Sequence, residues 1–401
     1  MNLGIEKLLQ NKGLIKKLEA KKVGLVAHPA SVNKELLHSV DLLSDHPQIN
    51  LVAAFGPQHG IRGDKQYNMI ESEGFVDSRL GIPVHSLYGE HRRPTQQMLK
   101  EVDVILYDLQ DLGCRIYTYL TTLIYVLEEA AKFGKEVWVL DRPNPIGTPI
   151  EGYGLEKEFI SFVGAWEGMP MRHGLSSGEI AKAYVYEKKL DVQLEVVEMD
   201  SYSPNFNGGW PSDSLAWVNP SPNIATLSAA RVYTGTVLFE GISLSEGRGT
   251  TRPLEIVGAP KFPAYEVIKE MNKIAPDLCR HVAMRPCFFE PTFDKFKGKL
   301  CEGLQIHADH AAYDHHNFQP YRAMLVLLKA CRKLDNSAFD WRQPPYEYET
   351  KKLPIDLLNG GTWLREWVDD PASEFNDLDS KLKVSEEQWE ELVAPHRIYL
   401  K

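Results

Sequence analysis

The sequence predicts an α/β fold built on a parallel β-sheet that is covered by helices. Through the first 140 residues, short runs rich in Val, Ile and Leu alternate with longer stretches in which apolar residues have helical spacing. The short runs are apolar at successive positions, which is typical of strands buried on both faces. This alternation of strand and helix indicates βαβ units and therefore a parallel sheet.

The N-terminal elements place several loops at one edge of this sheet. Predicted strands cover residues 23–27, 51–55, 83–87, 102–109 and 136–140, and predicted helices cover 34–43, 94–100 and 121–133. In parallel sheets, ligand-binding residues lie on loops just beyond the carboxyl ends of the strands. The segments 28–29, 56–60, 108–111 and 141–144 are therefore the first candidates for a functional site.

Beyond residue 145 the strand pattern loosens, and a domain boundary follows. Ser176 and Glu179 form a capping box that predicts a helix over 180–188, and a strand is predicted at 193–197. Residues 201–222 are rich in Ser, Pro, Asn and Gly and indicate a long surface segment. We place the boundary after this segment, which gives domains 1–226 and 227–401. The second domain has predicted helices at 264–273, 321–333 and 385–392 and a predicted strand at 303–308.

Charge and cysteine content exclude several classes of protein. The chain has 401 residues and a formal net charge of −10, which disfavours binding to nucleic acid. No run approaches the roughly 18 apolar residues that a membrane helix needs. The five cysteines are odd in number and form no C-x-x-C pair, which indicates reduced thiols rather than disulfides or a zinc site. The first residues show no export signal, so we expect a cytoplasmic protein.

The loop after the second predicted strand combines glycines with polar side chains. Residues 55–64 include Gln58, His59 and Arg62, and Glu71 lies in an acidic stretch a few positions later. Glycines allow the backbone to approach a ligand, and polar residues have little reason to cluster there for packing. The alternative is a tight turn with a surface Arg–Asp pair, followed by a solvated acidic loop.

Acidic and basic residues recur at the ends of the next two predicted strands. Asp108 and Asp111 precede Arg115 and Tyr117, and Asp141 and Arg142 precede Asn144. An acid beside an arginine at a strand end is either a structural ion pair or a group in a cleft with a tuned pKa. Recurrence at neighbouring strand ends favours the functional alternative.

Other motifs are weaker. Arg172 and His173 precede the capped helix, where anions are favoured, although a structural histidine is the better interpretation of His173 alone. Glu246 and Arg248 lie in a glycine-rich segment that lacks the Lys-Ser/Thr ending of a phosphate-binding loop, and no G-x-G-x-x-G follows the first strand. The histidine-rich residues 307–316 fit no ligand spacing and predict a surface loop. We therefore expect no metal and no cofactor.

Seven sequence blocks together resemble a known glycoside hydrolase family. In chain order they read FGPQHGIRG, IPVHSLYG, DLQDLGCRIYTY, VLDRPNPIG, FVGAWEGMPMRHGLSSGE, SPN and FEGISLSEGRGTTRP. This order resembles the exo-β-N-acetylmuramidase (NamZ-type) family. The resemblance implies a Rossmann-like N-terminal domain, a smaller α+β C-terminal domain and an active-site cleft between them. It also implies release of terminal N-acetylmuramic acid from peptidoglycan fragments.

The resemblance also suggests roles for individual residues. Relatives usually read PEHG in the first block, where the glutamate is a candidate catalytic acid, but here that position is Gln58. An amide cannot transfer the proton, and glycoside hydrolysis usually needs two carboxyls. The candidate catalytic acids are therefore Glu71, Glu246 and Asp108, with Asp64 and Glu73 as reserves. The candidate substrate-binding residues are Gln58, His59, Arg62, Asp111, Arg115, Tyr117, Asp141, Arg142, Asn144, Arg172, His173, Asn223 and Arg248.

Three alternatives stay open at this point. The sugar's own acetamido group could attack in a substrate-assisted mechanism, with Gln58 orienting it. The protein could instead be a non-catalytic or altered sugar-binding protein that lost the acid at position 58. A hydrolase or transferase acting on another carboxylated metabolite is a third reading. The expected partner is a small carbohydrate, a muropeptide or a muramic-acid sugar, and in the third reading another carboxylated metabolite. A locally basic cleft rich in arginine would hold the carboxylate in each case.

Overall fold

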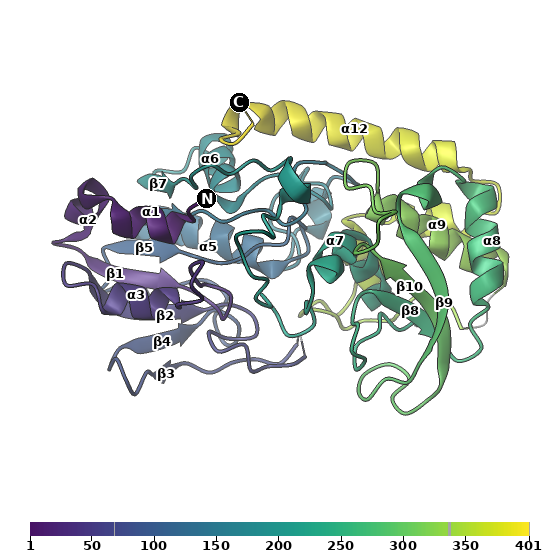
Figure 1. Cartoon of the computed structure of the whole chain (residues 1–401), viewed down its shortest axis with the longest axis horizontal. Coiled ribbons are helices and arrows are strands. Elements are labelled where there is room, and N and C mark those ends of the chain that lie inside the picture. Colours follow the sequence, from purple (N-terminus) through teal and green to yellow (C-terminus); the bar gives the residue numbers. More distant parts are fainter. Residues whose placement is uncertain (68, 336–337, 401) are drawn as a thin grey trace.

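The computed structural model describes residues 1–67, 69–335 and 338–400. Its N-terminal half is built on a seven-stranded sheet of order β3-β4-β2-β1-β5-β6-β7, parallel throughout except for the short edge strand β3 (Figure 1). The strands are β1 Lys22–Val26, β2 Asn50–Gly56, β3 Phe75–Val76, β4 Pro83–Ser86, β5 Val104–Tyr107, β6 Glu136–Leu140 and β7 Leu194–Val197. The predicted α/β class is therefore confirmed.

Helices cover both faces of this sheet. In β5, Val104 and Leu106 pack in one apolar cluster, whereas Ile105 and Tyr107 pack in another on the opposite face. The first cluster includes helices α1 Gly4–Gln10, α2 Lys12–Leu18 and α3 Ser39–Ser44, and the second includes α5 Thr118–Phe133 and α6 Ser177–Lys188. Burial of both side-chain sets explains why the strand sequences are apolar at successive positions.

Local hydrogen bonds decide where two of the predicted helices begin. Ser176 and Glu179 form the expected capping box, with Glu179 N–H donating to Ser176 Oγ at 3.2 Å. The helix predicted over 34–43 begins only at Ser39, because Asn33 Oδ1 accepts hydrogen bonds from the backbone of Leu37 and holds a turn there. Between β4 and β5 only the short helix α4 Gln96–Leu99 forms.

The C-terminal half contains a smaller antiparallel sheet of order β8-β10-β9 packed against helices. Its strands are β8 Ile256–Ala259, β9 Ala283–Phe289 and β10 Cys301–His307. Its helices are α7 Leu227–Thr236, α8 Ala264–Ile274, α9 Pro320–Lys333, α10 Pro354–Asn359, α11 Trp363–Asp369 and α12 Phe375–Val393. Sequence patterning found β10, α8 and α9, but it missed β8 and β9, which contain Gly258 and Pro286. Glycine and proline weaken a strand pattern in the sequence.

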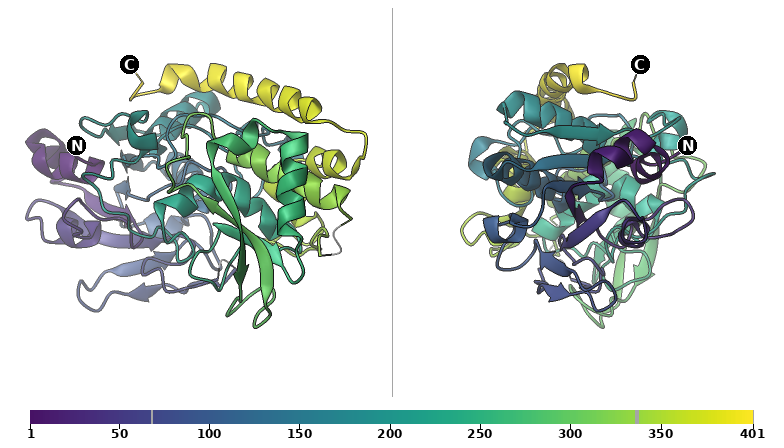
Figure 2. Two further views of the ribbon diagram at one scale, coloured as in Figure 1. Left: turned by 45° about the vertical axis from the view of Figure 1, so that its right-hand side comes forward. Right: turned by 90° about the vertical axis from the view of Figure 1, so that its left-hand side faces the viewer.

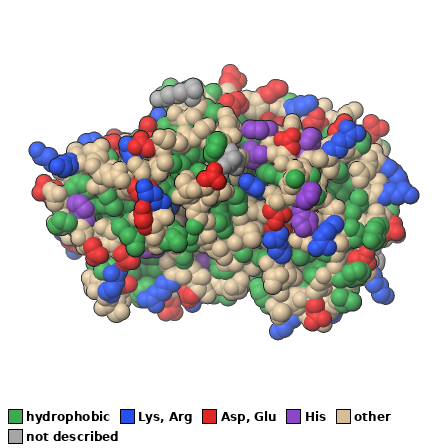
Figure 3. All heavy atoms as spheres, viewed as in Figure 1, with side chains coloured by type: hydrophobic (Ala, Val, Ile, Leu, Met, Phe, Trp, Pro, Cys, Tyr) green, Lys and Arg blue, Asp and Glu red, His purple; other side chains and the backbone are tan. Residues whose placement is uncertain are grey.

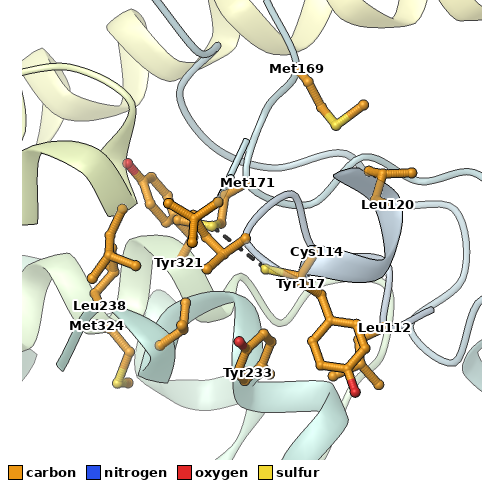
Figure 4. Close-up of a cluster of buried hydrophobic side chains, with 14 of the residues drawn as sticks. Leu112, Cys114, Tyr117, Leu120, Met169, Met171, Tyr233, Leu238, Tyr321 and Met324 are labelled. Carbon is orange, nitrogen blue, oxygen red and sulfur yellow. Dashed lines mark hydrogen bonds between the residues drawn. The ribbon is translucent and has the colours of Figure 1, made fainter. Parts of the chain in front are cut away.

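The two halves share one apolar core at their junction. Tyr117 and Met171 from the first half pack in the same cluster as Tyr233 and Tyr321 from the second (Figure 4). The thiol of Cys114 lies 3.7 Å from the Met171 sulfur within this cluster. Such packing fixes how the two halves face each other, so a cavity at the junction has defined walls.

The C-terminal helix α12 lies along both halves rather than on the second half alone (Figures 1 and 2). Trp389 of α12 donates a hydrogen bond to the carbonyl oxygen of His173 at 3.0 Å, and the Tyr399 hydroxyl donates to Asp141 at 2.8 Å. The chain therefore returns to the first half after completing the second. The division at residue 226 stays a prediction.

Charged side chains of both signs are mixed on the face of the molecule seen in Figure 3. Within the described ranges, no helix combines the length and the apolar character needed to cross a bilayer.

Candidate active site

A narrow cavity, which we call the junction cavity, lies where the two halves meet and has an empty volume of about 430 Å³. The loop after β2, the start of α5 and the segment before α7 supply its polar lining residues from the first half: Gln58, His59, Tyr117, Thr118 and Asn223. The second half supplies Glu240, Arg248, Tyr346 and Glu347. Gln58, His59, Tyr117, Asn223 and Arg248 were predicted from the sequence, and the structure brings them together here.

Gln58 connects the two walls of the cavity. The Thr118 hydroxyl donates to Gln58 Oε1 at 2.6 Å, and Gln58 Nε2 donates to Glu347 Oε1 at 3.1 Å. The other oxygen of Glu347 accepts a hydrogen bond from the Tyr88 hydroxyl at 2.9 Å. The Gln58 amide is therefore in direct contact with a carboxyl group from the opposite half.

Glu347 has the properties of a general acid. Burial raises its pKa to about 7, and the negative charge of Glu240 adds to this rise, although the hydrogen bonds from Tyr88 and Gln58 and the positive charge of Arg92 partly offset it. A carboxyl with a pKa near neutrality is protonated in about half of the molecules at pH 7 and can donate that proton. Glu347 and Tyr348 also adopt positive φ angles of 44° and 70°, a strained backbone of the kind found at functional sites.

Sequence reasoning missed Glu347. Its local sequence, Pro344-Pro345-Tyr346-Glu347-Tyr348-Glu349, alternates tyrosine with glutamate after two prolines. No predicted strand leads into this segment, so the rule that sites follow strand ends could not find it. The Tyr-Glu repeat was the available signal.

A second carboxylate in the cavity is held by a cation. Arg248 Nη2 donates to Glu240 Oε1 at 2.5 Å, and the Tyr346 hydroxyl donates to Glu240 Oε2 at 2.7 Å. Arg248 Nε also donates to Glu246 at 3.1 Å, and Lys295 Nζ lies 2.8 Å from the same carboxylate. Glu246 therefore contacts Arg248 but is not among the residues that line the junction cavity. Burial acts to raise its pKa, but the two cations outweigh burial and hold the pKa below its usual value.

His59 contributes a neutral imidazole to the cavity. Burial lowers its pKa to about 4, and the positive charge of Arg248 lowers it further. Nδ1 lies 2.7 Å from the carbonyl oxygen of Lys65, so Nδ1 carries the proton and Nε2 is left as a hydrogen-bond acceptor. His59 is thus suited to accept a hydrogen bond from a hydroxyl group, and unsuited to bind a carboxylate as a cation.

The predicted acids at the ends of β5 and β6 lie apart from this cavity. Asp108 is fully buried and binds Arg142 through both oxygens, at 2.6 and 2.9 Å. Burial raises the pKa of Asp141 to about 6, although hydrogen bonds from Ser176 at 2.7 Å and Gly178 N–H at 2.9 Å partly offset that rise. These contacts stabilise the loops that follow β5 and β6 and the N-terminus of α6.

Three more predicted residues have enclosed structural partners. His173 Nε2 lies 3.2 Å from Asp111 Oδ2, which also accepts the backbone N–H of Gly113 at 2.6 Å. Asn144 donates to the carbonyl oxygen of Leu175 at 3.0 Å. The contact with Asp111 supports a structural role for His173. The substrate-binding roles of Asp111, His173 and Asn144 stay predictions.

The predicted arginine-rich cleft does not form as a group. Arg115 donates to the carbonyl oxygens of Leu358 and Asn359, at 3.0 and 2.9 Å, and Arg172 donates to that of Ile146 at 2.5 Å. Both are buried and, like Arg142, bond to protein atoms. Of the five arginines expected in the cleft, Arg248 alone lines the junction cavity. Arginine side chains also donate hydrogen bonds to buried backbone carbonyl groups. The sequence alone does not show whether an arginine has this structural role or binds a ligand.

Arg62 and Glu71 lie on a separate, open depression together with Asp64 and Glu73. Arg62 is exposed and stacks on the Phe75 ring at 4.3 Å. Glu71 is also exposed and accepts a hydrogen bond from the Tyr348 hydroxyl at 3.0 Å. Glu71 thus approaches the residue next to Glu347 without lining the junction cavity. Within the described ranges, no cluster of three or more His, Cys, Asp or Glu side chains could hold a metal ion.

The comparisons with known proteins show which family the chain belongs to. Residues 23–228 match the family described as exo-β-N-acetylmuramidase NamZ, N-terminal, and residues 231–399 match its C-terminal counterpart. The chain belongs to the NamZ exo-β-N-acetylmuramidase family. It is 38% identical over 378 residues to the peptidoglycan β-N-acetylmuramidase NamZ of Bacillus subtilis, covering 94% of this chain and 86% of that relative. The resemblance seen in the seven sequence blocks is therefore confirmed.

Two crystal structures of DUF1343-family proteins from Bacteroides fragilis share the fold of this NamZ-family chain. The first has a TM-score of 0.86 and 30% identity, and covers 99% of this chain and 98% of that chain. The second has a TM-score of 0.72 at 22% identity over the same shares of both chains, and supports the fold alone.

Proposed function

We propose that this protein is an exo-acting β-N-acetylmuramidase that releases terminal N-acetylmuramic acid from peptidoglycan fragments, with Glu347 as its general acid. The observation that carries the catalytic assignment is the Glu347 carboxyl, which lines the junction cavity, contacts Gln58 and has a pKa raised to about 7. Family membership and the activity named for the Bacillus subtilis relative support the reaction and the sugar.

Glu347 and Glu240 divide the chemistry between them in this proposal. Glu347 donates its proton to the glycosidic oxygen as the bond to the terminal sugar breaks, and a water molecule then adds to the anomeric carbon and returns a proton to the Glu347 carboxylate. Glu240, paired with Arg248, supplies the negative charge that stabilises the positively charged sugar ring in the transition state. Gln58 then acts as a positioning residue, because both ends of its amide hold neighbouring groups. The acids Glu71, Glu246 and Asp108, predicted from the sequence, remain the competing assignments.

We further propose that the substrate is a muropeptide or related fragment and that the protein acts in the cytoplasm on imported or recycled material. Cys114, Cys279, Cys287 and Cys301 are free thiols, which suits a reducing compartment. Cell fractionation with an antibody against the chain tests the location. Full-length protein in an extracytoplasmic fraction would overturn it.

The activity is tested with a chromogenic β-N-acetylmuramide, together with calorimetric binding of N-acetylmuramic acid. Release of the chromophore establishes the glycosidase. Binding without release establishes instead the sugar-binding alternative that the amide at position 58 suggests. Absence of both binding and release favours the third reading, a different carboxylated metabolite.

A further inference from the structure

An open groove, which we call the Arg92 groove, begins at the far side of Glu347. It has an empty volume of about 1180 Å³, and its lining includes Arg92, Tyr125, Phe162, Glu347 and Tyr348. Glu347 lines both this groove and the junction cavity. The depression that holds Arg62 and Glu71 shares no lining residue with the junction cavity among the described residues. The Arg92 groove is therefore the continuation of the junction cavity beyond the proposed acid.

The position of a general acid defines what lies on each side of it. The acid must reach the oxygen that joins the released sugar to the rest of the substrate. If the terminal sugar occupies the junction cavity, the remainder of the substrate leaves it past Glu347. The groove on the other side of Glu347 is then where this remainder lies.

The two arginines of this groove differ in their partners. Arg93, its neighbour, lies 2.6 Å from Glu128 and stacks on Tyr125. Arg92 stacks on the ring of Tyr348 at 3.4 Å but forms no ion pair within the described ranges. Its Nε atom is buried and has no hydrogen-bond partner among the described residues. A buried guanidinium donor without a partner is costly unless an acceptor arrives.

We propose that the Arg92 groove binds the leaving part of the substrate and that Arg92 binds a carboxylate on it. Peptidoglycan fragments carry such carboxylates on lactyl groups and peptide stems, and a guanidinium fork matches a carboxylate in shape and charge. The rings of Tyr125, Phe162 and Tyr348 provide apolar faces for the sugar chain beside it. This proposal rests on the proposed function, since it assigns the second half of the same substrate.

The test compares two substrates that share the terminal sugar. One is a nitrophenyl β-N-acetylmuramide, whose leaving group has no carboxylate, and the other is a muramyl oligosaccharide with a peptide stem. In Arg92→Gln we expect the ratio of kcat/KM for the oligosaccharide to that for the nitrophenyl substrate to fall by about 10-fold or more, since a hydrogen bond to a charged group contributes about 1.5–3 kcal/mol. Arg92→Lys, which keeps the charge near Glu347 but loses the fork, is expected to lower the same ratio.

Arg79→Gln is the matched control, because Arg79 is an exposed arginine paired with Asp41 outside both cavities. An unchanged kcat/KM ratio in Arg92→Gln overturns the groove assignment. An equal loss of kcat/KM on both substrates also overturns it, since this would mean that Arg92 acts through Glu347.

The same variants are also titrated calorimetrically with the stem-bearing oligosaccharide. If the wild-type protein cleaves neither substrate, the proposed function fails. Loss of oligosaccharide binding in Arg92→Gln would then still support the groove, and unchanged binding would overturn it.

Discussion

Asp108 and Glu347 are both buried carboxyls, yet the structure gives them opposite surroundings. Asp108 lies at the end of β5, where both of its oxygens face the guanidinium of Arg142. Glu347 lies in a loop of the second half, where its hydrogen-bond donors are the neutral groups of Tyr88 and Gln58, and it faces a cavity. The difference teaches that burial alone does not mark a proton donor, because a direct ion pair favours the charged form of a carboxyl, whereas neutral hydrogen-bond donors leave the protonated form available.

The largest expected effect separates these two acids directly. Glu347→Gln removes the transferable proton while keeping an oxygen that can accept the Tyr88 hydroxyl. We expect kcat to fall by about 10²–10⁴-fold, the usual contribution of a general acid. Glu71→Gln, at an exposed glutamate that contacts Tyr348, is the control and is expected to lose far less. Turnover of Glu347→Gln within tenfold of wild type, with a large loss in Glu71→Gln, would return the role to Glu71.

Asp108→Ala should act on stability instead. The substitution leaves Arg142 buried without its carboxylate, and breaking such a pair costs about 3–5 kcal/mol. Urea denaturation followed by circular dichroism measures the change in the free energy of unfolding. A variant with wild-type stability but with turnover reduced as far as in Glu347→Gln would instead support the catalytic role predicted for Asp108.

The sequence predicted what depends on local pattern. Continuous apolar runs identified the strands of the parallel sheet, and Ser176 with Glu179 identified the start of α6. The glycine-rich loop after β2 predicted binding roles for Gln58 and His59, and the structure has both side chains at the junction cavity. In each case the signal lies within a few residues of the feature that it predicts.

Partners that are distant in sequence could not be predicted in this way. Glu347 reaches Gln58 across 289 positions, and Arg115 reaches the carbonyl of Leu358 across 243. An arginine or aspartate at a strand end looks the same in sequence whether it meets a ligand, a backbone carbonyl or another side chain. Only the folded chain shows which of these it meets.

The pH dependence of activity sharpens the comparison further. The pKa of Glu347 is raised from its usual value near 4.5 to about 7, so the acid form persists up to neutrality. We expect kcat/KM to fall about tenfold per pH unit above pH 7 as the proton is lost. Steady-state assays from pH 5 to 9 with the nitrophenyl substrate measure this limb. A profile with no break near pH 7 would contradict the assignment of Glu347 as the acid.

Gln58→Glu introduces the glutamate that the sequence resemblance leads us to expect at this position, and it tests the contact between the two halves. It replaces an N–H donor 3.1 Å from Glu347 with a second carboxyl. The pair then shares a proton, so its upper apparent pKa rises and the alkaline limb moves to higher pH by about one unit or more. An unmoved limb would show that residue 58 and Glu347 are not in contact in solution.

The smallest expected effect concerns Thr118, which holds Gln58 from the side opposite Glu347. Thr118→Val removes the hydroxyl that donates to Gln58 Oε1 at 2.6 Å while keeping the side-chain shape. Losing a hydrogen bond worth about 1 kcal/mol corresponds to roughly a fivefold fall in kcat/KM. Thr122→Val, one turn further along α5, removes a hydroxyl that bonds only the Thr118 carbonyl in the described structure and serves as the control.

Thr118→Val should also move the alkaline limb of the pH profile to higher pH, because a freed amide at Gln58 would no longer direct its N–H at Glu347. Thr118→Ser should restore the wild-type limb. A rate loss with no movement of the limb would mean that Thr118 supports the cavity wall rather than the Gln58–Glu347 contact.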